Sequence, residues 1–205
     1  MNLFLEKKLS RRGFCRVAGV DEVGRGSLAG PVVASAIVFK NLKISKKILR
    51  EIKDSKQLSP KKREEFFALL KNSADCQWQV AKVSAKVIDR INIEKATYLA
   101  MCQAVKKIKN QPDILLIDGN RFSAGRLKIP YKTIIKGDEK IFSIAAASII
   151  AKVTRDRLMI KMAKIYPEYG FEIHKGYGTK KHFRRVKKFG LSEIHRRSFL
   201  RGLVS

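Results

Sequence analysis

Acidic residues are scarce in this chain. Its 205 residues contain 18 aspartates and glutamates against 45 lysines and arginines, which gives a formal net charge of +27. So large an excess goes beyond what solubility requires, and its usual partner is a polyanion, either nucleic acid or an anionic membrane. A highly charged surface without a specific partner is the alternative interpretation. Hydrophobic residues make up 45% of the chain, a fraction typical of a folded domain.

Long hydrophobic runs are absent as well. The longest nearly uninterrupted run of apolar or small residues, SIAAASIIA at 143–151, is too short to span a bilayer. The N-terminal stretch MNLFLEKKLSRRGFC turns charged almost at once, so we expect no secretory signal. A membrane partner is therefore not expected, and nucleic acid remains the favoured polyanion.

Cysteine is rare, and the chain lacks local metal motifs built on cysteine or histidine. Cys15, Cys76 and Cys102 are widely spread and form no CxxC pair. They predict free thiols in a reducing compartment, and we expect a cytoplasmic protein. The three histidines, His174, His182 and His195, are too far apart for a local zinc motif.

Two familiar nucleotide-binding loops are also missing. The stretch GRGSLAG resembles a dinucleotide loop, but that fingerprint must open a helix, whereas Gly30-Pro31 leads into the strand-like run VVASAIVF. No GxxxxGK[ST] loop occurs. We expect the glycines to bring the backbone close to a ligand instead. Arg25, between Gly24 and Gly26, offers a forked donor to phosphate.

The apolar pattern predicts one α/β domain with a mixed sheet. Ser59-Pro60 and Asn92 are expected helix starts, and a long helix is expected over about 138–164. We expect a catalytic core over about 1–170 and a basic helical C-terminal extension over about 171–205, within a single domain spanning 1–205. The expected strands are 16–20, 32–39, 77–83, 113–118 and 131–136.

Three of the scarce acids stand where two expected strands end. Asp21 and Glu22 follow one apolar strand, and Asp118 closes the run DILLID. If these strands are neighbours, the three carboxylates converge at one rim, where sites of open α/β sheets form. Converging carboxylates repel one another unless a cation neutralises them, and oxygen ligands favour Mg²⁺ or Mn²⁺. A turn residue at each position is the structural alternative.

Asp138, just before the long helix, is a fourth candidate, and an N-cap is its structural interpretation. A divalent metal beneath a surface that attracts polyanions indicates phosphodiester hydrolysis. Two metal ions can hold the attacking water and the leaving oxygen in line. The competing hypothesis is a basic nucleic-acid binder without catalysis, which explains the charge but not the placement of the acids.

From Cys15 to Phe199 the chain resembles bacterial ribonuclease HII. The matching stretches are GVDEVGRGSLAGPVVASA, DSKQLSPKKRE, INIEKATYLAM, LLIDGN, KGDEKIFSIAAASIIAKVTRDRLM, YPEYGFEIHKGYGTKKH and GLSEIHRRSF. Their combination in this order is highly specific. The resemblance implies a ribonuclease H-like fold with a five-stranded mixed sheet flanked by helices. It also implies endonucleolytic cleavage of RNA within RNA–DNA hybrids, and incision 5′ of single ribonucleotides in duplex DNA, giving 3′-hydroxyl and 5′-phosphate ends.

By motif position, the resemblance implies that Asp21, Glu22, Asp118 and Asp138 are the catalytic and metal-binding acids. It assigns the Gly24-Arg25-Gly26 turn to recognition of the ribose 2′-hydroxyl. It assigns Tyr177 to packing against the sugar. Some relatives carry a longer tail with a clamp-binding motif, whereas this sequence stops soon after HRRSF, so a sliding-clamp partner is not expected. We expect a monomer that acts on RNA–DNA hybrids and on DNA duplexes containing ribonucleotides.

Several further residues carry weaker expectations. Successive side chains alternate on a strand, so we expect Asp21 to point into the carboxylate cluster. Glu22 is expected to reach it from the end of the strand or to offer its backbone carbonyl. Asp156 is interpreted as half of a structural ion pair and Trp78 as a core residue, while Lys152 is left open. Ten basic residues are expected to contact duplex phosphates: Lys175, Lys180, Lys181, Arg184, Arg185, Lys187, Lys188, Arg196, Arg197 and Arg201.

Overall fold

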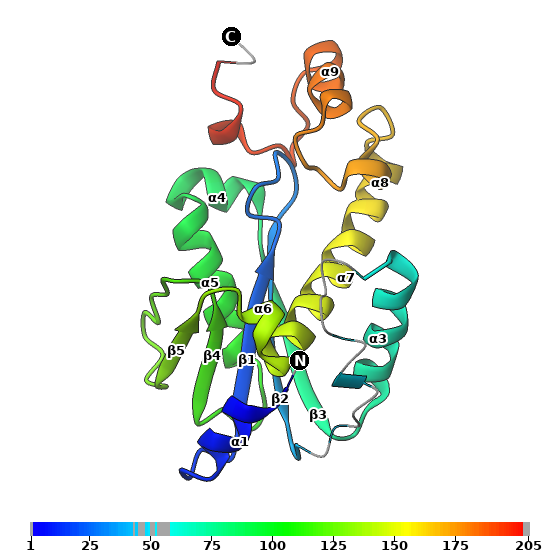
Figure 1. Cartoon of the computed structure of the whole chain (residues 1–205). Coiled ribbons are helices and arrows are strands. Elements are labelled where there is room, and N and C mark those ends of the chain that lie inside the picture. Colours follow the sequence, from blue (N-terminus) through cyan, green and yellow to red (C-terminus); the bar gives the residue numbers. More distant parts are fainter. Residues whose placement is uncertain (1, 43, 45–47, 50–51, 53–57, 203–205) are drawn as a thin grey trace.

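A five-stranded mixed sheet forms the centre of the protein. The computed structural model describes residues 2–42, 44, 48–49, 52 and 58–202. The strands run side by side in the order β3-β2-β1-β4-β5 (Figure 1). The fold class predicted from the sequence is therefore confirmed. The strands are β1 (Val17–Val23), β2 (Val32–Phe39), β3 (Cys76–Val83), β4 (Ile114–Asp118) and β5 (Tyr131–Ile134).

Strand direction brings the expected site residues together. β1 pairs antiparallel with β2 and parallel with β4, in a register that sets Val20 beside Ile117. Asp21 follows Val20 and Asp118 follows Ile117, so the two acids lie at the same level on neighbouring strands. Parallel neighbours end at one edge of a sheet, which is where ligand sites form in such folds.

β1 is longer than the sequence predicted. The expected strand ended at Val20, but β1 continues to Val23 because β2 still pairs with it at Asp21, Glu22 and Val23. Asp21 and Glu22 therefore lie inside a strand rather than after it. On their other side β4 has already ended at Asp118, which leaves that edge of β1 open.

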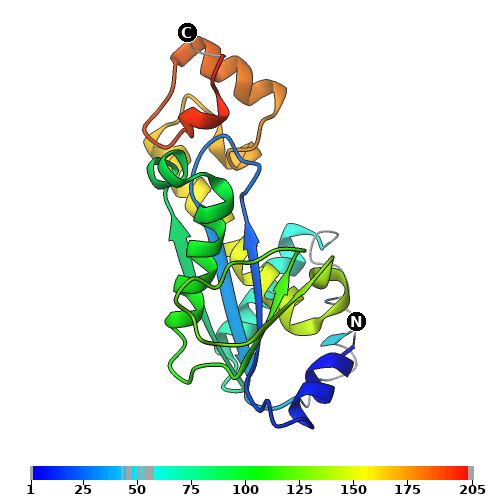
Figure 2. The ribbon, with the colours of Figure 1, turned by 90° about the vertical axis from the view of Figure 1, so that its left-hand side faces the viewer.

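Helices cover both faces of the sheet (Figures 1 and 2). On one face α4 (Ala85–Ile91) and α5 (Ile93–Lys106) pack over residues such as Val20 and Ala34. On the other, α3 (Pro60–Asn72) and α7 (Phe142–Ile165) pack over Ile37 and Phe39. The contact of α7 with β1 is close, since a Cβ on Gly19 would lie 2.1 Å from the main-chain carbon of Ser143.

Local signals explain where several helices begin. The side chain of Ser59 accepts a hydrogen bond from the amide of Lys62 at 3.3 Å, with Pro60 at the first helical position of α3. Asn92 caps α5 in the same way, accepting from the amide of Lys95 at 3.0 Å. Both predicted helix starts are confirmed.

The long helix expected over 138–164 is two helices. α6 (Gly137–Lys140) is a single short turn, and α7 begins at Phe142. Ile141 between them is extended and forms a β-bridge with Asn2, so the helix cannot run through it. The N-cap of α6 is Lys136, so the N-cap interpretation of Asp138 is wrong.

An N-terminal helix that the sequence did not reveal supports α7. Glu6 in α1 (Phe4–Ser10) is 1% exposed and accepts a hydrogen bond from the amide of Ser143 at 3.0 Å. An acid at a helix N-terminus satisfies amides that lack a partner within the helix. α1 thus caps α7 from outside.

The C-terminal segment rests on the connection between β1 and β2 (Figure 1). It comprises α8 (Phe171–His174), α9 (Lys180–Phe189) and the short 3-10 helix η1 (Arg197–Phe199). Isolated bridges join Ser27 to Tyr177 and Ala29 to His195. Among the described residues, no helix is both long and apolar enough to cross a membrane.

Candidate active site

A cleft of about 350 Å³ opens at the carboxyl ends of β1 and β4. Three of the four acids proposed from the sequence line it. Two residues of the Gly24-Arg25-Gly26 turn, hereafter the glycine–arginine turn, and one residue of the C-terminal segment also line it. The lining residues are Asp21, Glu22, Val23, Gly24, Arg25, Arg63, Asp118, Ser148, Lys152 and Tyr177.

Asp21 is the most deeply buried acid of the cleft, with 4% of its surface exposed. Burial raises its pKa well above the usual value, and the neighbouring charges of Glu22 and Asp118 raise it further. A hydrogen bond from Ser148 on α7 acts in the opposite direction. Asp21 Oδ1 also accepts from the amide of Glu22 at 2.7 Å, which fixes the orientation of the carboxylate.

Glu22, the next residue of β1, lines the same cleft. Burial raises its pKa, Arg25 lowers it and Asp118 raises it. Arg25 Nη1 lies 3.5 Å from Glu22 Oε1, a long contact at the rim. Glu22 and Asp118 line the same cleft, so Glu22 is not remote from Asp118.

Asp118 connects the cleft to α6. Its Oδ1 accepts a hydrogen bond from the amide of Gly137 at 2.7 Å, and Asp138 is the next residue along. Asp138 is 2% exposed and does not line the cleft. The structure therefore places Asp21, Glu22 and Asp118 around one cavity and sets Asp138 beside it.

The carboxylates of the cleft are suitable ligands for a divalent cation. Within the described ranges, no group of three or more His, Cys, Asp or Glu side chains is close enough to hold a metal ion by itself. Mg²⁺ commonly uses only one or two protein carboxylates and completes its shell with water and substrate phosphate. Asp21, which is buried, and Glu22, which is partly buried, both have a raised pKa and would gain most from a bound cation.

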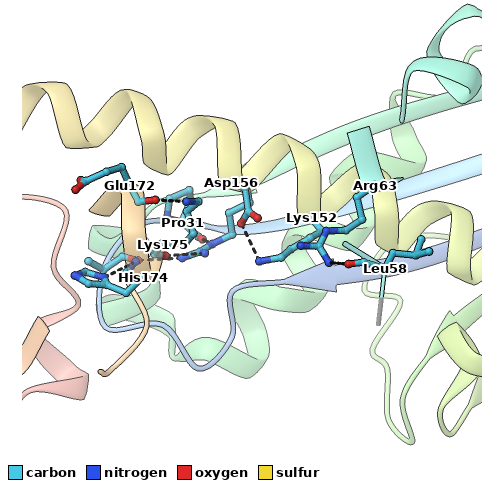
Figure 3. Close-up of polar contacts among 11 residues, drawn as sticks. Pro31, Leu58, Arg63, Lys152, Asp156, Glu172, His174 and Lys175 are labelled. Atoms are coloured by element: carbon cyan, nitrogen blue, oxygen red, sulfur yellow. Dashed lines mark hydrogen bonds and ion pairs between the residues drawn. The ribbon is translucent and has the colours of Figure 1, made fainter. Parts of the chain in front are cut away.

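Two polar residues of α7, Ser148 and Lys152, line the cleft together with the acids. Ser148, Lys152 and Asp156 are spaced four residues apart, so they share one face of the helix. Lys152 Nζ donates to Asp156 Oδ1 at 2.9 Å (Figure 3). The structural ion pair predicted for Asp156 is confirmed, with Lys152 as its partner. Lys152 Nζ also lies 5.8 Å from the centre of the Tyr177 ring.

Arg63 from α3 is a further cation of the cleft, and it was not singled out from the sequence. Its Nη1 donates to the carbonyl oxygen of Leu58 at 2.6 Å (Figure 3). Residues 54–57, the start of the DSKQLSPKKRE motif that carries part of the family resemblance, lie outside the described residues.

Some proposed phosphate contacts are not available at the surface. Arg196 is completely buried, so its placement among the phosphate-binding residues is wrong. The three histidines are buried as well, and His182 Nε2 lies 3.0 Å from His195 Nε2. They pack the C-terminal segment. Trp78, partly buried against Phe67, is a core residue as predicted.

Comparison with known proteins decides the family. The family model described as Ribonuclease HII matches residues 18–202. The chain belongs to the ribonuclease HII family. A curated ribonuclease HII of Chlorobium luteolum is 51% identical over 187 residues, which cover 91% of this chain and 89% of the relative. The chain is therefore a ribonuclease H-type enzyme, a hydrolase that depends on a divalent metal.

Solved structures agree on the fold. The ribonuclease H2 of Pyrococcus horikoshii superposes with a TM-score of 0.76 at 29% identity, covering 92% of this chain and 96% of that one. The ribonuclease HII of Archaeoglobus fulgidus, solved in complex with PCNA, gives a TM-score of 0.71 at 27% identity over 88% of this chain and 93% of that one.

Proposed function

We propose that this ribonuclease HII hydrolyses the RNA strand of RNA–DNA hybrids and incises duplex DNA on the 5′ side of single embedded ribonucleotides. The products are a 3′-hydroxyl and a 5′-phosphate. The observation that carries the proposal is the cleft in which Asp21, Glu22 and Asp118 meet the glycine–arginine turn and Tyr177. Metal-binding acids and groups suited to sugar recognition thus share one cavity.

The proposed metal ligands are the carboxylates of Asp21, Glu22, Asp118 and Asp138, and the proposed metal is Mg²⁺ or Mn²⁺. Two such ions, held by these carboxylates, would supply the Lewis-acid chemistry that activates an attacking water and stabilises the leaving oxygen of an in-line displacement. Asp21 is held by Ser148 and by the amide of Glu22, so its carboxylate is oriented before substrate arrives. The amide of Gly137 holds Asp118 in the same way.

Recognition of ribose is proposed for the Gly24-Arg25-Gly26 turn and Tyr177. The 2′-hydroxyl is the group by which a protein distinguishes RNA from DNA at a given site. The β-bridge between Ser27 and Tyr177 keeps the turn and the ring side by side at the mouth of the cleft. A single turn therefore connects the proposed cutting site to the proposed sugar site.

The exposed cations of α9 are proposed to bind duplex phosphates. His182 and Val186 face the interior, whereas Lys180, Lys181, Arg184, Lys187 and Lys188 are exposed. Figure 1 shows α9 on the same side of the molecule as the carboxyl end of β1. A duplex seated on the cleft would meet this basic face.

The catalytic proposal is tested by Asp118→Asn. We expect cleavage of a duplex with one ribonucleotide to fall at least a hundredfold in Mg²⁺, because the substitution removes a proposed metal ligand, while binding of the duplex persists. The control is Asp113→Asn, at the start of the same strand, where the acid pairs with Arg16. Full activity in Asp118→Asn, or equal losses in both variants, would contradict the proposal.

A further inference from the structure

Two arginines are completely buried, whereas the other lysines and arginines among the described residues are exposed or partly exposed. Arg155 lies on α7 and Arg196 lies just before η1, and each has 0% of its surface exposed. Burying a guanidinium group is costly unless its donors are all satisfied. Their partners therefore indicate what these residues hold in place.

The side chain of Arg196 binds main-chain carbonyl groups of the glycine–arginine turn. Its Nη2 donates to the carbonyl oxygen of Gly24 at 2.7 Å, and its Nη1 donates to that of Arg25 at 2.8 Å. Its Nε donates to the carbonyl oxygen of Gly30 at 3.0 Å. One guanidinium group thus joins both ends of the connection between β1 and β2.

Arg155 holds the other side of the same connection. It donates to the carbonyl oxygens of Ala29 at 3.1 Å, Pro31 at 3.0 Å and Lys175 at 2.9 Å. Figure 3 shows Pro31 and Lys175, which lie far apart in the sequence, converging beside α7. The guanidinium carbon of Arg155 is also 5.3 Å from the centre of the Tyr177 ring.

These contacts fix which way the peptide groups of the turn face. The carbonyls of Gly24 and Arg25 point toward Arg196, and the protein has no cis peptide bonds in its described part. In a planar trans peptide the N–H points opposite to the C=O. The amides of Arg25 and Gly26 therefore point away from the buried guanidinium, and both residues are exposed.

We propose that Arg155 and Arg196 are positioning residues for ribose recognition. Together they lock the connection 24–31 and the segment bearing Tyr177 into one rigid unit, with two outward-facing amides beside the cleft. This inference rests on the proposed function, because it assigns the turn a sugar to recognise. Such preorganisation contributes to catalysis only if the geometry is held before the substrate binds.

Lysine is the informative replacement, because it keeps the charge but cannot reproduce the planar fork that reaches three carbonyls. Arg196→Lys is compared with Arg157→Lys, a control on α7 whose side chain is exposed and pairs with Glu64. Hydrogen–deuterium exchange is measured on Leu28, Ala29 and Gly30, whose amides are hydrogen-bonded to main-chain carbonyls. Steady-state cleavage of a duplex with one ribonucleotide is measured in parallel.

In Arg196→Lys we expect exchange of those three amides to rise at least tenfold while exchange of β4 is unchanged. We also expect kcat to fall at least tenfold with KM within twofold, because the phosphate contacts remain. Arg157→Lys should match the wild type in both measurements. Wild-type exchange in Arg196→Lys, or a loosened turn with wild-type kcat, would overturn the proposal.

Arg155→Lys provides the same test if Arg196→Lys does not fold, since it leaves every contact of Arg196 in place. Failure of the proposed function gives a different result. In that case the wild-type enzyme itself would not distinguish a ribonucleotide duplex from an all-DNA duplex. The exchange measurement would still show whether the two arginines hold the turn.

Discussion

Gly24 and Gly26 flank the same arginine, but they meet different surroundings. Gly24 has φ +91°, and a Cβ on it would lie 2.2 Å from Arg155 Nε. A Cβ on Gly26 would meet nothing within 4 Å. Gly24 is thus required by both backbone conformation and packing, whereas Gly26 tolerates a side chain in the free protein.

Stability measurements on two alanine variants test this difference. Gly24→Ala should lower the free energy of unfolding by about 1–3 kcal/mol from the backbone conformation alone, with a further loss because Arg155 must move. Gly26→Ala should change it by less than about 0.5 kcal/mol. Urea denaturation provides both values, and equal destabilisation by the two substitutions would contradict the structure.

At the residue scale, the acids were predictable, whereas the arginines that hold the neighbouring turn were not. Asp21, Glu22 and Asp118 stand out because acids are scarce and these follow apolar runs. Arg155 and Arg196 carry no such signal, since a buried arginine cannot be told from a surface one in so basic a chain. Their role depends on carbonyls of residues 24–31, which only the folded chain brings to them.

At the scale of elements, the C-terminal segment is held by a buried histidine cluster. The rings of His174 and His182 stack with centres 4.3 Å apart, and His195 contacts His182. Burial lowers the pKa of His182 and of His195 from 6.5 to about 4, so both are neutral when folded at pH 7. The cluster joins α8, α9 and the residues before η1 into one packed unit.

This cluster predicts a specific pH dependence. Between pH 6.5 and 4 the unfolded chain binds protons at these histidines and the folded chain does not. The contribution of these two histidines to the unfolding free energy is therefore complete above pH 6.5. It should fall as the pH drops toward 4. NMR titration of the ring protons provides the check: in the folded protein His182 and His195 should stay neutral at pH 5. Titration of both near pH 6.5 would contradict the structure.

Most elements follow from local pattern, and the exceptions have tertiary causes. β2 begins and ends as predicted, and the caps of α3 and α5 are where Ser59 and Asn92 indicate them. The extension of β1 to Val23 depends on pairing with β2, and the break at Ile141 depends on its bridge to Asn2. Neither partner is visible in a local stretch of sequence.

At the scale of the whole molecule, the acidic and the basic side chains with proposed functions lie in different places. The acids that a metal would neutralise lie within the cleft, while the basic face of α9 is exposed on the same side of the molecule. α1, also rich in exposed cations, lies at the opposite end (Figure 1). The net charge of +27 attracts polyanions from all sides, but only part of it can contact a duplex seated on the cleft.

Salt dependence of duplex binding distinguishes these two surfaces. Neutralising Lys181, Arg184 and Lys188 of α9 with glutamine should make the negative slope of log K against log salt shallower by about 2–3, because each lost phosphate contact removes about 0.9 from its magnitude. The same change at Lys7, Lys8 and Arg11, around α1, should leave the slope nearly unchanged. A flat slope in the wild type, or equal effects of the two triple variants, would contradict the assigned surface.

In the proposed function, one cleft both cuts the strand and recognises the sugar at the cut. The most direct test is a DNA duplex with one embedded ribonucleotide, incubated with the wild-type enzyme in Mg²⁺ beside the same duplex made entirely of DNA. We expect a single incision on the 5′ side of the ribonucleotide, leaving a 3′-hydroxyl and a 5′-phosphate, and no incision of the all-DNA duplex. Incision elsewhere, other end groups, or cutting of both duplexes would contradict the proposed function.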